Sequence, residues 1–338
     1  MTTLHNLGFP RIGARRELKQ AVEAYWAGTL QQSELEHVGR SLRERHWTLQ
    51  ADDQPVSLDT LFRMARGRAP SGEPAAACEM TKWFDTNYHY IVPELEGDQR
   101  FRIARETLFD QVDEARALNL DAKPVIPGPL TYLYLSKGES FDGAADSAKL
   151  TLLENLIPVY RTILQRFADQ GVTWVQIDEP ILCLDLPDAW QRAYLRVYDQ
   201  LAGAASVKLL LATYFEGLRD NLFTALQLPV AGLHLDRVRG NDPLDQVLPR
   251  LGDKVLSLGL VNGRNVWRCD LDKALEVARH AAERLGERLW LAPSCSLLHS
   301  PVDLDQEDRL DDELKSWLSF AKQKLDELAV LGGALDGG

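Results

Sequence analysis

Six short apolar runs, separated by polar loops and helical patterns, are the feature that most restricts the fold of this chain. They occupy residues 123–135, 172–182, 207–215, 230–238, 254–263 and 289–300. Near-continuous apolar strands that alternate with helices are typical of a parallel sheet that is covered on both faces. The pattern therefore predicts an α/β protein, and its regular repetition predicts a (β/α)8 barrel of the TIM type.

The expected elements do not complete such a barrel. A further candidate strand at residues 75–84 brings the number to seven, whereas a barrel needs eight. Apolar residues at a 3.6-residue period predict helices over residues 152–171, 272–290 and 312–331, and Gly171 is placed where the first of these should stop. The polar loops after the strands would then gather at one rim.

The length allows one large domain. The chain has 338 residues, and α/β barrels routinely exceed about 250 residues as one unit. We expect a single barrel domain over residues 1–338, with an N-terminal helical segment over residues 1–50 and the barrel body over residues 51–338. The final LGGALDGG is typical of a frayed or truncated end.

Charge and cysteine content exclude several classes of protein. The formal net charge is −12 and the isoelectric point about 5.1, so the overall field repels nucleic acids and anionic membranes, and we expect neither as a partner. The four cysteines lie far apart without a C-x-x-C pair, which argues against a disulfide framework. The N-terminus is too polar for a signal peptide, so the expected location is the cytoplasm.

The segment LGFPRIGARRELK is a candidate anion clamp. Pro10 and Gly13 mark a turn, after which Arg15 and Arg16 fall at the start of a helix, where free N–H groups favour an anion. Guanidinium groups bind carboxylates or phosphates through two parallel hydrogen bonds. A solvated helix start explains the same residues, so both interpretations stay open.

The segment EMTKWFDTNYHYIVPEL gathers aromatic rings around Lys82 and Asn87. Rings with an interspersed amine and amide suit the rim of a small-molecule pocket. Core packing explains the aromatic residues equally well.

The segment WVQIDEPIL places Asp178 beside Glu179 at a strand end. Three interpretations compete, namely acid/base catalysis, binding of a cation or metal, and a strand-to-loop corner. Successive strand residues face opposite sides, so only one carboxylate can point into a barrel mouth. Pro180 then ends the ladder.

A metal site could be assembled from His234, Asp236, Cys295 and His299, which all lie near strand ends. Their spacing is not a recognised ligand pattern, and single residues of these types are more often hydrogen-bonded core groups. The pattern therefore favours core groups over a zinc site, and both interpretations stay open.

Five segments, in order along the chain, resemble the N-terminal domain of cobalamin-independent methionine synthase. They are LGFPRIGARRELK, RGRAPSGEPAAACEMTKWFDTNYHY, WVQIDEP, GLVNGRNVWRCDL and SCSLLHSPVDL. The enzymes of this family consist of two face-to-face (β/α)8 barrels. Their C-terminal barrel holds zinc and transfers a methyl group from 5-methyltetrahydropteroyltri-glutamate to homocysteine.

The resemblance implies a binding role for this half. Arg15, Arg16, Glu17 and Leu18 match the segment that the family uses at the oligoglutamate tail of the folate, and Lys82 matches a second contact to that tail. The WVQIDEP strand end looks like the non-catalytic twin of a similar strand end in the catalytic barrel. At most two of the four zinc ligand types survive here. The resemblance therefore implies that zinc is bound in the other half, and that this chain holds no metal and no catalytic residue.

The sequence departs from the family pattern in two places. The C-terminal catalytic barrel is absent, so we expect the chain alone to make no methionine. Between Trp47 and Leu58 a family stretch with a barrel strand is shortened to TLQADDQPVS, which implies an incomplete first strand.

Two other functions stay open. The chain could be a stand-alone barrel enzyme that uses Asp178 or Glu179 with Asp236 as acid/base groups, or a non-catalytic scaffold barrel. Turnover by the isolated chain, lost on Glu179→Gln, would favour the first.

Overall fold

The computed structural model describes residues 17–35, 37, 58–70 and 77–337. The chain divides into two compact units. The first comprises Met1–Lys82, His89–Glu114 and Leu135–Ile163, and the second comprises Trp83–Tyr88, Ala115–Tyr134 and Leu164–Gly338. One domain over residues 1–338 stays a prediction.

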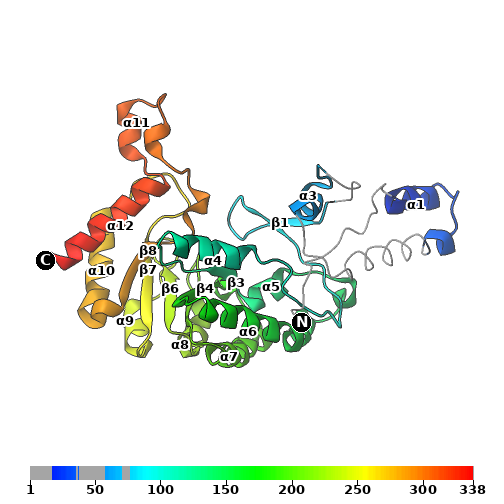
Figure 1. Cartoon of the computed structure of the whole chain (residues 1–338), viewed down its shortest axis with the longest axis horizontal. Coiled ribbons are helices and arrows are strands. Elements are labelled where there is room, and N and C mark those ends of the chain that lie inside the picture. The colour runs from blue at the N-terminus through cyan, green and yellow to red at the C-terminus, as the bar shows by residue number, and fades with distance from the viewer. Residues whose placement is uncertain (1–16, 36, 38–57, 71–76, 338) are drawn as a thin grey trace. The chain divides into compact units, whose positions relative to one another are not determined.

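The elements follow the labels of Figure 1. The helices are α1 (Glu17–Trp26), α3 (Leu58–Arg66), α4 (Thr107–Ala117), α5 (Pro129–Leu135), α6 (Leu153–Asp169), α7 (Asp188–Ala202), α8 (Leu222–Gln227), α9 (Leu244–Val247), α10 (Leu271–Leu285), α11 (Asp312–Trp317) and α12 (Ala321–Asp336). The strands are β1 (Met80–Lys82), β2 (His89–Ile91), β3 (Val125–Pro127), β4 (Trp174–Asp178), β5 (Lys208–Ala212), β6 (Gly232–Asp236), β7 (Val255–Val261) and β8 (Leu289–Pro293). None of the helices in the described ranges has the length and apolar character that crossing a membrane requires.

The first unit contains a small antiparallel sheet of two strands. β1 pairs with β2, with Met80 opposite Ile91 and Lys82 opposite His89. The predicted barrel strand at residues 75–84 is therefore wrong in its described part, because the next segment of the chain folds back and takes its backbone hydrogen bonds. Of the expected helical segment at residues 1–50, α1 is confirmed.

The second unit is built on one parallel sheet of six strands in the order β3-β4-β5-β6-β7-β8. All six predicted apolar runs supply a strand, so the α/β class with a parallel sheet is confirmed. The run at residues 123–135 supplies only a short strand, because β3 has three residues and α5 begins at Pro129. An N–H at the first position of a helix has no intrahelical partner, so proline, which lacks this N–H, loses no hydrogen bond there.

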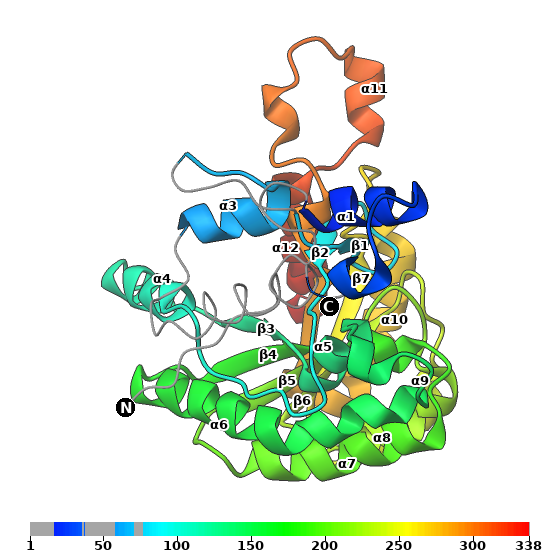
Figure 2. The same ribbon diagram turned by 90° about the vertical axis from the view of Figure 1, so that its right-hand side faces the viewer.

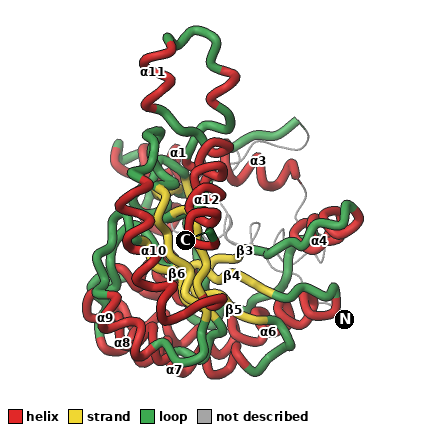
Figure 3. Tube along the Cα trace, turned by 90° about the vertical axis from the view of Figure 1, so that its left-hand side faces the viewer, coloured by secondary structure: helices red, strands yellow, loops and turns green. Residues whose placement is uncertain are grey.

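The sheet is strongly curved, with α7, α8, α9 and α10 along its outer side (Figures 2 and 3). Trp174 of β4 and Trp290 of β8 are separated by three strands, yet their ring centroids lie 4.7 Å apart. Such a contact is possible only when the inner face is concave. Gly232 of β6 leaves the space, because a Cβ there would lie 3.3 Å from the ring of Trp174.

The predicted helix over residues 312–331 is wrong as one element, because it forms two helices. Leu318 makes an antiparallel bridge with Trp267, and the N–H of Ser319 donates to the carbonyl of Val266 at 2.8 Å. These contacts draw the backbone away from helical geometry between α11 and α12. α11 consequently projects beyond the strands in Figure 1.

A prediction follows from the close approach of β7 to the segment after β8. A Cβ at Gly259 would lie 2.6 Å from the Cα of Ser294, so backbone must move to admit it. We expect Gly259→Ala to lower the free energy of unfolding by about 1–3 kcal/mol. The matched control is Gly203→Ala, where a Cβ meets no atom within 4 Å. Urea unfolding of both variants checks this, and equal stabilities would contradict it.

Candidate functional site

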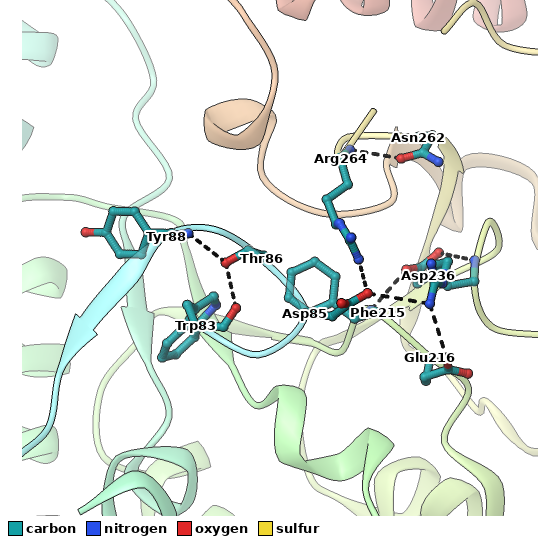
Figure 4. A network of polar contacts seen from close by, with 10 residues as sticks. Trp83, Asp85, Thr86, Tyr88, Phe215, Glu216, Asp236, Asn262 and Arg264 are labelled. Carbon is teal, nitrogen blue, oxygen red and sulfur yellow. Dashed lines mark hydrogen bonds and ion pairs between the residues drawn. The ribbon is translucent and has the colours of Figure 1, made fainter. Parts of the chain in front are cut away.

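The candidate site lies at the carboxyl ends of the six parallel strands in the second unit. Because the strands are parallel, the loops that follow them lie at the same edge of the sheet, which is where barrel enzymes hold their ligands. Figure 4 shows the polar contacts at this edge. The turn at residues 83–88 belongs to the same unit and contributes to them.

A chain of polar side chains runs along the inner face to this edge. Lys123 donates to the amide oxygen of Gln176, whose Nε2 donates to Oδ1 of Asp178 at 2.7 Å. Tyr214 donates its hydroxyl to Oδ2 of Asp178 at 2.8 Å, and Nε1 of Trp83 donates to Tyr214 at 3.3 Å. Burial raises the pKa of Asp178, while hydrogen bonds from Gln176 and Tyr214 and the charge of Lys123 oppose the rise. Asp178 is thus a positioned carboxylate facing the concave side.

Glu179 points to the opposite, helix-covered face, as strand alternation predicted. Its Oε1 accepts hydrogen bonds from the N–H of Leu130 at 3.3 Å and the hydroxyl of Tyr198 at 3.1 Å. Its Oε2 accepts from the N–H and hydroxyl of Thr131, at 2.8 and 2.6 Å, and from Tyr194 at 3.0 Å. The side chain is fully buried, and burial raises its pKa to about 7 against those hydrogen bonds. Of the three interpretations, the contacts favour the strand-to-loop corner for Glu179.

Asp236 at the end of β6 organises two loops. Its carboxylate accepts from the N–H of Phe215 at 3.0 Å, of Val238 at 2.8 Å and of Arg239 at 2.9 Å. Burial raises its pKa, and these backbone hydrogen bonds oppose the rise. The acid/base hypothesis requires a carboxylate that can reach a substrate. Glu179 and Asp236 are instead buried and accept hydrogen bonds from backbone N–H groups.

The residues that suggested a metal site do not fit one. Nε2 of His234 lies 3.2 Å from the carbonyl of Ser294, so it carries the proton, and Nδ1 accepts from the hydroxyl of Ser257 at 2.9 Å. Burial lowers the pKa of His234 to about 4 and raises that of Cys295 to about 12. Among the described residues, no group of three or more His, Cys, Asp or Glu side chains could hold a metal ion. His234 and Cys295 have the surroundings of buried core groups rather than of zinc ligands.

The turn at residues 83–88 is bound to the strand ends by charge. Asp85 forms an ion pair with Arg264, which follows β7, and a second with Arg239, which follows β6, at 3.5 Å. The turn is closed internally by Thr86, whose hydroxyl donates to the carbonyl of Trp83 at 2.7 Å (Figure 4). The sequence analysis did not predict these ion pairs. Asp85 and Arg264 nevertheless lie in two of the segments that carry the family resemblance, MTKWFDTNYHY and GLVNGRNVWRCDL.

The residues predicted to bind the oligoglutamate tail are only partly described. Arg15 and Arg16 lie outside the described residues, and Glu17 and Leu18 belong to α1 without a described side chain. Lys82 ends β1 and is exposed. That these five residues bind the tail together stays a prediction.

Comparison with known proteins gives a family match. The family described as "Cobalamin-independent synthase, N-terminal domain" matches residues 3–56 and 49–286 of the chain. Among the solved structures, a putative vitamin-B12 independent methionine synthase from Listeria monocytogenes is 15% identical, with a TM-score of 0.50, and the alignment covers 100% of this chain and 98% of that chain.

Two further solved structures share the fold. A B12-independent methionine synthase from Shewanella sp. W3-18-1, in complex with selenomethionine, is 13% identical with a TM-score of 0.59, over 91% of each chain. A methyltransferase from Methanosarcina mazei is 13% identical with a TM-score of 0.53, over 77% of this chain and 76% of that chain. At these identities the likeness supports the fold alone.

The contacts of Glu179 generate a prediction for Glu179→Gln. Leu130 and Thr131 donate backbone N–H groups to different oxygens of the carboxylate, so an amide in either orientation sets its NH2 against one of them. We expect the variant to lose about 1–3 kcal/mol of stability. The exposed Glu287→Gln serves as the control and should change stability by less than about 0.5 kcal/mol.

The pH dependence has a definite sign. The folded protein keeps the Glu179 proton up to a pKa of about 7, whereas the unfolded chain releases it near 4.5. The contribution of Glu179 is therefore fully present below pH 4.5 and is lost as the pH rises through 7, by about 3 kcal/mol at most. Urea unfolding at about pH 5 and about pH 8 should show the advantage of the native protein over Glu179→Gln shrinking at the higher pH. An advantage that is constant across this window would contradict the assignment.

Proposed function

Because the chain belongs to the cobalamin-independent synthase family and matches its N-terminal domain, we propose that it is the folate-tail-binding half of a methionine synthase. In this role it helps to hold the oligoglutamate tail of 5-methyltetrahydropteroyltri-glutamate. The methyl group would pass to homocysteine in the zinc-containing C-terminal barrel, which is the expected partner. The family match over most of the chain is the observation that carries this proposal.

The proposal includes a closed (β/α)8 barrel. Six sequential parallel strands and the contact between Trp174 and Trp290 support a sheet that curves toward closure.

The side chains at the strand ends support a binding role rather than a catalytic one. Glu179 and Asp236 hold backbone, and His234 has both ring nitrogens occupied. Lys82 is exposed and carries the positive charge that a carboxylate tail requires. The proposal places the protein in the cytoplasm, where its four free cysteines would stay reduced.

One second candidate is a stand-alone barrel enzyme, and the position of Asp178 at the end of β4, with hydrogen bonds from Gln176 and Tyr214, supports it. In that case Asp178, which faces the concave side, would be the acid/base group, and the isolated chain would turn over substrate. Loss of that turnover in Asp178→Asn would identify this candidate.

The first candidate predicts charge-dependent tail binding. Titration with 5-methyltetrahydropteroyltri-glutamate should give tighter binding than the mono-glutamate form, and raised salt should weaken it. Loss of one charge-assisted hydrogen bond in Lys82→Ala should weaken tri-glutamate binding about tenfold, and Arg15→Ala/Lys82→Ala further.

Lys273→Ala is the matched control, because Lys273 is an exposed lysine on α10. Equal affinity for the two folate forms, or equal losses in Lys82→Ala and Lys273→Ala, would refute the tail site. If binding appears only after the C-terminal barrel is added, the tail site requires both halves.

A further inference from the structure

A pair of arginines at the strand ends holds a single carboxylate. Arg264 and Arg239 follow two neighbouring strands, β7 and β6, and both form ion pairs with Oδ2 of Asp85. Figure 4 shows the side chain of Arg264 directed at Asp85. We refer to Arg239 and Arg264 as the arginine clamp.

The clamp is held in place by contacts that do not involve Asp85. The N–H of Arg264 donates to Oδ1 of Asn262 at 2.9 Å, and its guanidinium lies 5.9 Å from the ring centroid of Phe215. The backbone N–H of Arg239 donates to Asp236 at 2.9 Å, and its guanidinium lies 3.7 Å from Glu216. Each guanidinium therefore keeps one contact when Asp85 moves away.

Asp85 is the one carboxylate that both cations of the clamp share. Glu216 lies 3.7 Å from Arg239 and 3.8 Å from Arg219, and Arg219 has a further partner in Asp185 at 3.5 Å. A ligand with several carboxylates would give each guanidinium of the clamp a carboxylate of its own.

Asp85 can be exchanged for such a ligand. Its side chain is 54% exposed, and the side chains of Arg239 and Arg264 are 47% and 31% exposed, so solvent reaches the contact. Exposed ion pairs contribute little net stability, which a competing carboxylate can offset. Asp85 also belongs to a short turn, so its release needs no change in the parallel sheet.

We propose that the arginine clamp is a carboxylate-binding site that Asp85 occupies in place of a ligand. The ligand is a flexible polycarboxylate, and its binding displaces Asp85 and releases the turn at residues 83–88. This inference rests on the proposed function, because the glutamate tail of the folate is such a ligand and Lys82 immediately precedes the turn. Asp85 then blocks the arginine clamp until a carboxylate of the tail replaces it.

The test uses a tri-γ-glutamate peptide without the pteridine, and glutarate as a simple dicarboxylate. Removing the competing charge in Asp85→Asn should tighten peptide binding about fivefold, while Asp85→Glu, which keeps the charge, should not. Arg264→Gln in the Asp85→Asn background should cancel the gain. Asp253→Asn removes an exposed carboxylate elsewhere and should leave the affinity unchanged. A gain with the peptide but not with glutarate identifies a tail, and a gain with both identifies carboxylates in general.

Hydrogen exchange supplies a second measurement on the native protein. The N–H of Trp83 donates to the carbonyl of Tyr88 at 2.7 Å, and this N–H should exchange faster when the peptide saturates the protein. Equal peptide affinity in Asp85→Asn and Asp253→Asn, with unchanged exchange over residues 80–91, would overturn the proposal. Should Asp85→Asn fail to fold, the exchange measurement decides alone.

The two proposals fail separately. If Lys82→Ala binds the peptide normally while Asp85→Asn binds it more tightly, the tail site at Lys82 is wrong and the arginine clamp stands. If Lys82→Ala weakens binding while Asp85→Asn has no effect, the clamp is wrong and the tail site stands.

Discussion

The carboxylate of Glu179 is the interaction on which the strand-end edge of this fold depends. Two backbone N–H groups at the start of α5 and two tyrosine hydroxyls of α7 converge on it in a fully buried space. A buried carboxylate is tolerated only when its hydrogen bonds are made, so β4, α5 and α7 are tied together at one point. Gly128 is required beside it, because a Cβ there would lie 2.0 Å from the carboxyl carbon.

That anchor also determines what Asp178 does. With Glu179 held on the helix-covered face, strand alternation sets Asp178 on the concave face, in the hydrogen-bonded chain from Lys123 to Trp83. Two adjacent carboxylates thus have separate tasks, one in holding the scaffold and one in lining the site. The charged turn at residues 83–88 meets the same edge through Asp85, which pairs with Arg264 in the segment after β7.

Sequence patterns predicted the main sheet well and the edges of the elements less well. The six apolar runs each produced a strand, because parallel strands covered by helices need apolar residues on both faces. The run at residues 75–84 produced β1, which pairs with β2 and lies outside the parallel sheet, because an apolar stretch does not reveal whether its partner is a barrel strand or the returning arm of a hairpin. The helix over residues 312–331 was split by contacts of Leu318 and Ser319 with the loop at Val266 and Trp267, which no local periodicity reports.

The sequence by itself determined the α/β class, the order of the six strands, the opposite orientation of Asp178 and Glu179, and the family. These follow from periodicity and from motifs, which are local properties of the chain. Only the tertiary structure decided that five donors surround Glu179, that His234 has no free ring nitrogen, and that Asp85 lies between Arg239 and Arg264. Asp85 and Arg264 are 179 residues apart, and their pairing depends on how a curved sheet brings distant loops to one edge.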